Sequence, residues 1–183
     1  MMSRNLCLVG MMGVGKSTVA QMVADRLGRR VADTDDEIRA WTGRSIPELF
    51  ADHGEAGFRQ LERHVVQELA TFHDLVISLG GGAVLRDDNV AELLLTGVIV
   101  HLDAPPNVLI ERLEGDNDRP LLAGDMPAQL RATYDARHDR YLEVADVTFD
   151  AAREVDTIAA DIIGWSSAQG DVLTPSEHEQ VMT

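Results

Sequence analysis

The segment GMMGVGKS, residues 10–17, constrains the fold of this chain more than any other stretch. It fits the pattern G-x-x-x-x-G-K-[ST], in which glycines let successive backbone N–H groups turn inward around an oxygen-rich anion. A short apolar run, residues 5–10, precedes it, and an amphipathic pattern, about residues 17–27, follows it. The N-terminus of such a helix presents partial positive charge to a phosphate group. The sequence therefore predicts a phosphate-binding loop between a buried strand and a helix.

Individual residues of this loop have predictable roles. Lys16 is expected to reach the β- and γ-phosphates of a nucleotide as a catalytic residue, and the Ser17 hydroxyl is expected to ligate Mg²⁺. The expected nucleotide contacts of the loop are Gly13, Val14, Gly15, Lys16, Ser17 and Thr18. The alternative, a chance glycine-rich turn, does not account for the strand before the loop and the helix after it. ATP or GTP binding with Mg²⁺ follows, but the fate of the γ-phosphate does not.

Four further apolar runs continue the alternation of strand and helix. The predicted strands are residues 5–10, 29–33, 74–79, 97–103 and 146–150, and the predicted helices are about 17–27, 35–42, 45–54, 55–71, 88–95, 105–115, 127–144 and 157–165. This alternation predicts an α/β fold with one parallel sheet covered on both faces. Such sheets bind ligands beyond the carboxyl ends of their strands, where Gly10, Asp33 and Gly80 each lie. These three residues are therefore expected to share one site.

Two aspartates, Asp33 and Asp35, stand at the end of the second predicted strand in the sequence DTD. In an extended chain their side chains point to the same side while Thr34 points away, so both can face a cleft. One acid near Mg²⁺ and one near an acceptor hydroxyl would suit a kinase. Asp35 also precedes a helix and could serve only as its N-cap, and the residues alone leave these two alternatives open.

Arginines placed opposite glycine-rich turns indicate an anionic acceptor in an otherwise acidic chain. Arg59 and Arg63 share a predicted helix, although surface ion pairs with neighbouring acids are the alternative for both. Three consecutive glycines, residues 80–82, follow a strand and would let backbone amides approach a ligand closely. Arg119 lies in a polar loop, and Arg137 lies in a long charged helix. Because a guanidinium pairs with both oxygens of a carboxylate, the acceptor is expected to be an acid.

Charge and composition narrow the partners and the location. The net charge of −15 and the pI near 4.6 repel polyphosphate backbones, so bound nucleic acid is not expected. The single cysteine, Cys7, excludes an intramolecular disulfide and fits a reducing cytoplasm. The first residues contain no apolar stretch long enough for a signal peptide or a membrane span. A cytoplasmic protein without a membrane partner is therefore expected, with one domain in residues 1–165 and a polar, disordered tail in residues 166–183.

Several motifs together give the chain a family resemblance over about residues 6–163. The motifs are GMMGVGKST, DTD, TGRSIPELFADHGEAGFRQLE, SLGGGAV and DNDRPLLAG, in this order and spacing. The chain resembles the shikimate kinases. The resemblance implies a P-loop kinase fold like that of nucleoside monophosphate kinases, a three-layer sandwich with a five-stranded parallel sheet of order 2-3-1-4-5. It also implies a helical substrate-binding region, about residues 34–61, and a lid, about residues 114–126.

The resemblance also implies a reaction and roles for single residues. Shikimate kinases transfer the γ-phosphate of ATP to the 3-hydroxyl of shikimate, giving shikimate 3-phosphate and ADP, on the route to aromatic amino acids. By resemblance, Asp33 would hold Mg²⁺ through water, and Asp35 would hold the shikimate hydroxyls and act as base. The remaining implied contacts are Arg59, Gly80, Gly81, Gly82 and Arg137 for shikimate, Arg119 for phosphates and substrate during transfer, and Arg112 and Arg153 for adenine.

Two alternatives to this interpretation stand beside it. A kinase for a sugar acid such as gluconate would also bind an acceptor carboxylate with arginines. A nucleotide-binding regulator without catalytic activity is the other alternative, although Lys16, Asp33, Asp35 and Arg119 are all present. The expected partners are ATP and shikimate alone, and the expected state is a monomer.

Overall fold

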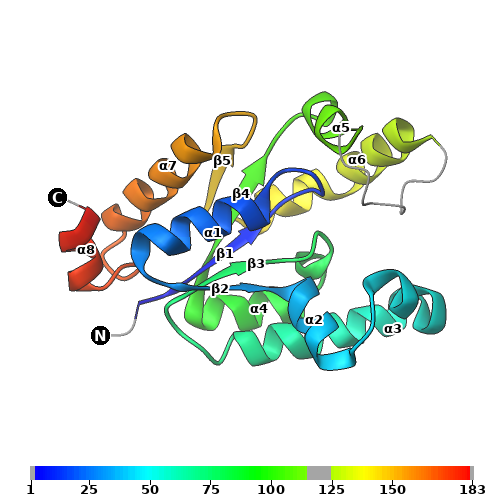
Figure 1. The fold of residues 1–183 in the computed structure, drawn as a ribbon, viewed down its shortest axis with the longest axis horizontal. Helices are drawn as coiled ribbons and strands as arrows, with labels where there is room; N and C mark the ends of the chain where they lie inside the picture. The colour runs from blue at the N-terminus through cyan, green and yellow to red at the C-terminus, as the bar shows by residue number, and fades with distance from the viewer. Residues whose placement is uncertain (1–2, 115–124, 182–183) are drawn as a thin grey trace.

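Five short strands form one parallel sheet in the computed structural model, which describes residues 3–114 and 125–181 (Figure 1). The strands are β1 (Asn5–Val9), β2 (Arg30–Asp33), β3 (Leu75–Ser78), β4 (Gly97–Asp103) and β5 (Val147–Asp150). Their order in the sheet is β2-β3-β1-β4-β5, and every neighbouring pair is parallel. The structure thus confirms the strand order 2-3-1-4-5 expected from the sequence. Every residue of the central strand β1 is buried, as a strand covered on both faces must be.

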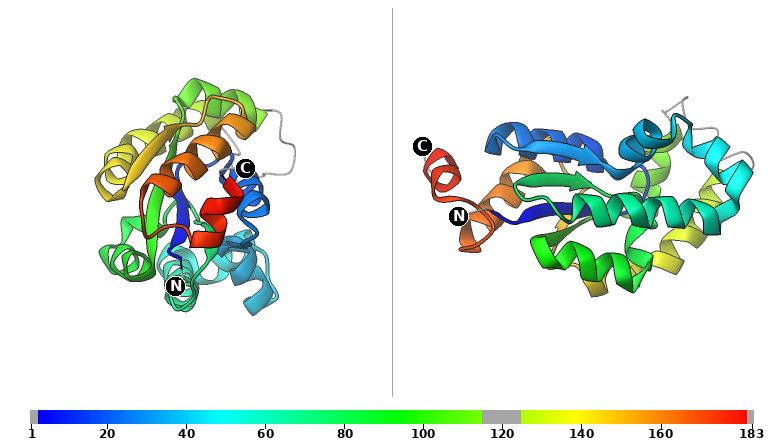
Figure 2. Two further views of the ribbon diagram at one scale, coloured as in Figure 1. Left: turned by 90° about the vertical axis from the view of Figure 1, so that its left-hand side faces the viewer. Right: turned by 90° about the horizontal axis from the view of Figure 1, so that it is seen from below.

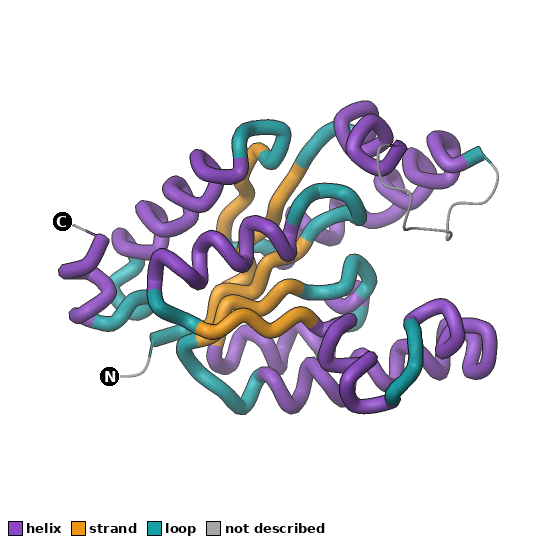
Figure 3. Tube along the Cα trace, viewed as in Figure 1, coloured by secondary structure: helices purple, strands orange, loops and turns teal. Residues whose placement is uncertain are grey.

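Helices cover both faces of this sheet (Figures 2 and 3). On one face, α1 (Lys16–Leu27) packs against α7 (Val155–Ala168). On the other face, the second half of α3 (Ile46–Leu69) packs against α4 (Asp87–Thr96). The remaining helices are α2 (Thr34–Thr42), η1 (Ala83–Leu85), α5 (Pro106–Glu114), α6 (Met126–Val144) and α8 (Pro175–Val181). Within the described ranges, none of these helices combines the length and apolar character needed to cross a membrane.

The strand register brings the carboxyl ends of the strands to one edge of the sheet. Ser78 lies beside Asp33 on one side and beside Leu8 on the other. Gly10 follows β1 directly, and Gly80 follows β3 after one residue, Leu79, so both reach this edge. The expectation that Gly10, Asp33 and Gly80 meet there is therefore confirmed. The two termini lie at the opposite end of the sheet (Figure 1).

The region between β2 and β3 consists of helices that extend beyond the carboxyl edge of the sheet (Figure 1). Ser45 and Glu48 form a reciprocal capping box at the start of α3. Gly54 interrupts α3 with a φ of 64°, which glycine adopts without strain. The chain therefore changes direction at residue 54, where the sequence predicted the boundary between two helices.

The C-terminal segment differs from its prediction. We expected residues 166–183 to be disordered, but α7 continues to Ala168 and the helix α8 follows. Glu177 of α8 forms an ion pair with Arg29, and both side chains are almost fully buried. Val172 and Leu173 are also buried. The prediction of disorder is therefore wrong for residues 166–181, because these long-range contacts are not visible in the local polar composition.

Candidate active site

The loop between β1 and α1 is shaped to hold an anion. Gly10 lies against β4 so closely that a Cβ atom there would collide with the backbone oxygen of Leu102. Gly15 precedes α1 with a φ of 97°, and no side chain caps the first amides of this helix. Lys16 Nζ donates hydrogen bonds of 2.8 and 3.0 Å to the carbonyl oxygens of Gly10 and Met11. The loop thus presents helix-terminal N–H groups and one ammonium group at the carboxyl edge of the sheet.

Three oxygen-bearing side chains gather beside this loop. Ser17 Oγ donates a 2.9 Å hydrogen bond to Asp33 Oδ2 and lies 3.4 Å from Ser78 Oγ. Mg²⁺ prefers oxygen ligands and commonly takes one or two carboxylates together with substrate phosphates, so this set fits the ion. In residues 3–114 and 125–181, no group of three or more His, Cys, Asp or Glu could hold a metal ion. Ser78 was missed by sequence reasoning, although its place at the end of β3 could have indicated it.

Asp33 and Asp35 differ in their surroundings. Asp33 is the N-cap of α2, and its Oδ1 accepts a 3.0 Å hydrogen bond from the backbone N–H of Asp35. The helix begins at Thr34, one residue earlier than predicted, so Asp35 lies in its first turn and is not the cap. Thr34 is buried, and its Oγ1 accepts a 2.8 Å hydrogen bond from the N–H of Gly80. The predicted alternation is therefore wrong for Asp35, yet both acids still face one cavity.

The pKa of Asp35 lies above its usual range. Burial raises it most, and the neighbouring charge of Asp33 raises it further, while Arg39 and Lys16 oppose the shift. A carboxyl group with a raised pKa is a stronger proton acceptor once it is ionised than an ordinary aspartate. This property suits a group that receives a hydrogen bond or a proton from a hydroxyl.

One cavity of about 450 Å³ joins these groups to the arginines and the glycine turn. Of the residues expected to act, those that line it are Gly13, Gly15, Lys16, Ser17, Thr18, Asp33, Asp35, Arg59, Gly80, Gly81, Gly82, Arg112 and Arg137. Its apolar wall includes Ile46, Phe50 and Phe58. The structure therefore brings nearly all of the expected side chains into one space.

Arg59 is held against the glycine turn by acids of its own helix. Its Nη1 donates a 2.7 Å hydrogen bond to Glu62 Oε2, and its Nη2 lies 3.4 Å from Glu55 Oε1. A Cβ atom at Gly82 would collide with the Arg59 guanidinium, so glycine is required for this placement. Sequence reasoning missed Glu62, whose position one helical turn after Arg59 was the available signal.

Glu62 is a buried acid in the wall of the cavity. Its side chain is 1% exposed, and its Oε1 has no hydrogen-bond partner among the described residues. Burial raises the pKa of Glu62, and the charge and hydrogen bond of Arg59 oppose that shift only in part. A Cβ atom at Gly80 would lie 2.9 Å from this oxygen and 3.2 Å from Asp35 Oδ1. The two acids therefore approach the same glycine from α3 and α2.

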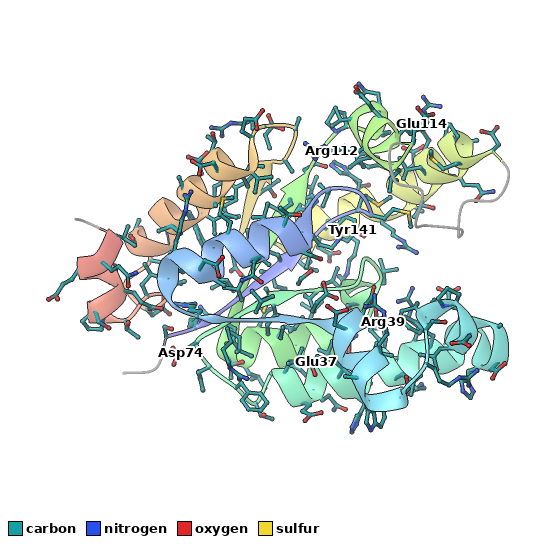
Figure 4. The ribbon with its side chains drawn as sticks, viewed as in Figure 1. Glu37, Arg39, Asp74, Arg112, Glu114 and Tyr141 are labelled. Carbon is teal, nitrogen blue, oxygen red and sulfur yellow. The ribbon has the colours of Figure 1, made fainter. Side chains whose placement is uncertain are left out.

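Arg137 reaches the same turn from α6. Its Nη1 donates a 3.4 Å hydrogen bond to the carbonyl oxygen of Gly81, and the hydroxyl of Tyr141 donates to that oxygen too. Tyr141 is almost fully buried and stacks on His101, so it belongs to the packing between α6 and the sheet. Figure 4 shows Tyr141 between α6 and the sheet. Arg59 and Arg137 thus converge on consecutive glycines, as two cations around one anionic group would.

The remaining arginines considered from the sequence differ in where they lie. Arg112, labelled in Figure 4, lines the cavity. It donates a 3.3 Å hydrogen bond to the carbonyl oxygen of Val14, whose own side chain is buried. Arg153 forms an exposed ion pair with Asp161 and does not line the cavity. Arg63 pairs with Asp88, as the alternative for it supposed. Most of the expected lid, about residues 114–126, lies outside the described residues, and so does Arg119.

Comparisons with known proteins give matches that agree with one another. The model of the shikimate kinase family matches residues 12–166. A shikimate kinase of Synechococcus elongatus is 48% identical over 140 residues, which are 76% of this chain and 73% of that protein. A shikimate kinase of Thiobacillus denitrificans is 46% identical over 151 residues, 82% of each chain. The solved structure of shikimate kinase from Acinetobacter baumannii in complex with shikimate has a TM-score of 0.85 at 37% identity, covering 91% of this chain and 94% of that one.

Proposed function

The chain belongs to the shikimate kinase family, ATP-dependent kinases that act on an alcohol group of shikimate, and we propose the residues by which it does so. The observation that carries the proposal is the single cavity that joins the phosphate loop, Asp35 and the paired arginines. Phosphoryl transfer needs little covalent help from a protein, so positioning and charge neutralisation are the main tasks.

The phosphate loop binds the triphosphate of ATP in this proposal. The uncapped first amides of α1 contact the β-phosphate, and Lys16 exchanges its loop carbonyl partners for β- and γ-phosphate oxygens. Arg112, which already contacts the loop at Val14, lies over the nucleotide and contacts its adenine end. Arg119 of the expected lid contributes a further positive charge to the transferring group.

Magnesium is the proposed cofactor. Ser17 would ligate the ion directly and Asp33 would hold it through water, because both already share one hydrogen bond at the phosphate edge. When bound, the ion supplies positive charge to the phosphate oxygens. Ser78 Oγ lies 3.4 Å from Ser17 Oγ, and it would help Asp33 to hold this water.

The acceptor lies between the glycine turn and α3. Arg59 and Arg137 bind its carboxylate, and the backbone of residues 80–82 approaches its ring without side-chain obstruction. Asp35 accepts a hydrogen bond from the 3-hydroxyl and fixes its oxygen in line with the γ-phosphate. Glu62 holds Arg59 in place, so a carboxylate can meet both guanidinium groups at once. The helical region, about residues 34–61, thus carries most of the acceptor contacts.

We propose that the chain acts as a monomer, because its own phosphate loop, Asp35, Arg59 and Arg137 already meet in one cavity. The buried thiol of Cys7 is consistent with the cytoplasmic location expected from the sequence. Light scattering during size-exclusion chromatography measures the mass directly, and a mass near twice 20.0 kDa would contradict the monomer.

A coupled assay of ADP release tests the function. With ATP and Mg²⁺, shikimate should support turnover, and gluconate at the same concentration should not. Preferential use of gluconate would favour the sugar-acid alternative. ATP binding without transfer to any acceptor would favour the regulator.

A further inference from the structure

A group of ring and acid side chains joins α6 to the end of β4, outside the cavity. We call it the β4–α6 cluster and define it as His101, Asp103, Tyr134 and His138. Asp103 Oδ1 accepts a 3.2 Å hydrogen bond from the Tyr134 hydroxyl, and Asp103 Oδ2 lies 3.1 Å from His138 Nε2. The Tyr134 and His138 rings stack with centroids 4.6 Å apart. None of the four residues lines the cavity, and the proposed function gives them no role.

The cluster holds α6 at the level of Arg137. Residues three, four and seven apart lie on one face of a helix, so Tyr134, His138 and Tyr141 face the sheet together with Arg137. Asp103 therefore holds α6 one turn before Arg137 and again at the next residue. Its two oxygens fix both the rotation of the helix and its distance from β4. Arg137 itself donates a long hydrogen bond to Gly81 and interacts with the hydroxyl of Tyr141, another residue of α6, so its position depends on that of the helix.

The charges of the cluster make Asp103 its centre. Burial lowers the pKa of His101 to about 4, against the opposing effect of Asp103, so this ring is neutral at physiological pH and packs against Tyr141. Burial, with the charge of Asp103 added, raises the pKa of Tyr134 to about 12, so its hydroxyl remains a donor. One carboxylate thus connects both α6 rings to the strand. Charged acceptors make stronger hydrogen bonds than neutral ones.

We propose that Asp103 is a positioning residue for the acceptor acid: through Tyr134 and His138 it sets the place of α6, and hence the reach of Arg137 to the acceptor carboxylate. The inference rests on the proposed function, because Arg137 must bind that carboxylate for its position to matter. A mutation far from the reacting atoms can lower the rate about 100-fold when it misplaces a group by about 1 Å, so a displaced helix has a measurable effect.

The test is a double-mutant cycle on kcat/KM for shikimate. Asp103→Asn keeps the shape of the side chain but removes its charge, and should lower kcat/KM for shikimate about tenfold while KM for ATP stays unchanged. Arg137→Ala alone should lower kcat/KM for shikimate by a larger factor than Asp103→Asn alone. On the Arg137→Ala background, Asp103→Asn should have almost no additional effect, because no guanidinium remains to be positioned. Asp139→Asn, an exposed acid on the same helix, is the matched control and should change neither constant.

The outcomes separate this inference from the proposed function. The inference is overturned if Asp103→Asn lowers kcat/KM for shikimate by the same factor with and without Arg137. It is also overturned if the variant lowers kcat/KM equally for shikimate and for ATP, because either result would show a merely structural role for Asp103. An unchanged kcat/KM in Asp103→Asn would overturn it as well. In either case the effect of Arg137→Ala would leave the proposed function intact, whereas no turnover of shikimate by the unaltered chain would remove both. If Asp103→Asn fails to fold, Tyr134→Phe and His138→Gln enter the same cycle, with a smaller loss of about threefold each and the same criteria.

Discussion

Gly82→Ala gives the sharpest perturbation of the acceptor site. The backbone at Gly82 has a φ of −104° and a ψ of −7°, which alanine also adopts, so the substitution introduces no backbone strain. The new Cβ atom would instead collide with the Arg59 guanidinium. That group is the end of a flexible side chain and can move aside. The free energy of unfolding should therefore fall by less than about 1 kcal/mol, while Arg59 leaves the position in which we propose that it binds the acceptor carboxylate.

The size of the binding effect follows from the lost contact. A hydrogen bond between charged groups contributes about 1.5–3 kcal/mol. Since about 1.4 kcal/mol corresponds to a tenfold change in affinity, KM for shikimate should rise about 10- to 100-fold. KM for ATP should not change. Initial rates with each substrate varied in turn give both constants, and thermal melting gives the stability.

A matched control separates this effect from a general response to an added methyl group. Gly164 lies in α7, and a Cβ atom there would meet nothing within 4 Å. Gly164→Ala should therefore leave both constants unchanged. An unaltered KM for shikimate in Gly82→Ala would refute the assignment of Arg59 to the acceptor carboxylate.

Two further predictions concern other parts of the chain. Asp35→Asn should bind ATP nearly normally but lose about 100-fold or more of turnover, and near-native turnover of the variant would contradict the proposed role of Asp35. Because burial and the charge of Asp33 raise the pKa of Asp35, the acid limb of the native pH–rate profile should lie above the ordinary aspartate range. Glu177→Gln leaves the buried Arg29 charge unpaired, which should lower the free energy of unfolding by about 3 kcal/mol and the melting temperature by about 6–12 °C at pH 7. The control variant Asp156→Asn removes an exposed ion pair with Arg26 and should change the melting temperature very little. Burial raises the pKa of Glu177, but hydrogen bonds from Arg29 and Thr174 outweigh that effect and hold it below the ordinary value. The stability that the ionised Glu177 contributes is therefore present above its unfolded-state pKa and is lost as the pH falls through its lower folded-state pKa. The melting temperatures of the native protein and of Glu177→Gln should therefore converge in acid. Equal melting temperatures at pH 7 would contradict the ordered tail.

The sequence predicted those features that depend on local patterns. The apolar runs of the three inner strands, β1, β3 and β4, were predictable because a strand buried on both faces needs continuous apolar residues. The glycines and Lys16 predicted the phosphate loop, because their spacing is itself the mechanism of binding. Gly54 likewise marked the break in α3, because a positive φ is a local property.

Features that depend on distant contacts could not be predicted in this way. Arg29 and Glu177 are 148 residues apart, so nothing near either one indicates a buried pair. Asp33 rather than Asp35 caps α2, because the helix begins one residue earlier than the alternation of a strand suggested. Asp103 and His138 are polar residues on different elements, and only the fold shows that they meet.

The position of the transferred phosphate tests the central claim most directly. Incubation of the protein with ATP, Mg²⁺ and shikimate, followed by ¹H–³¹P correlation NMR of the product, identifies the oxygen that carries the phosphate. We predict a correlation to the proton at carbon 3, as the proposed contact of Asp35 with the 3-hydroxyl requires. A phosphate on another hydroxyl, or inorganic phosphate with unchanged shikimate, would contradict the account.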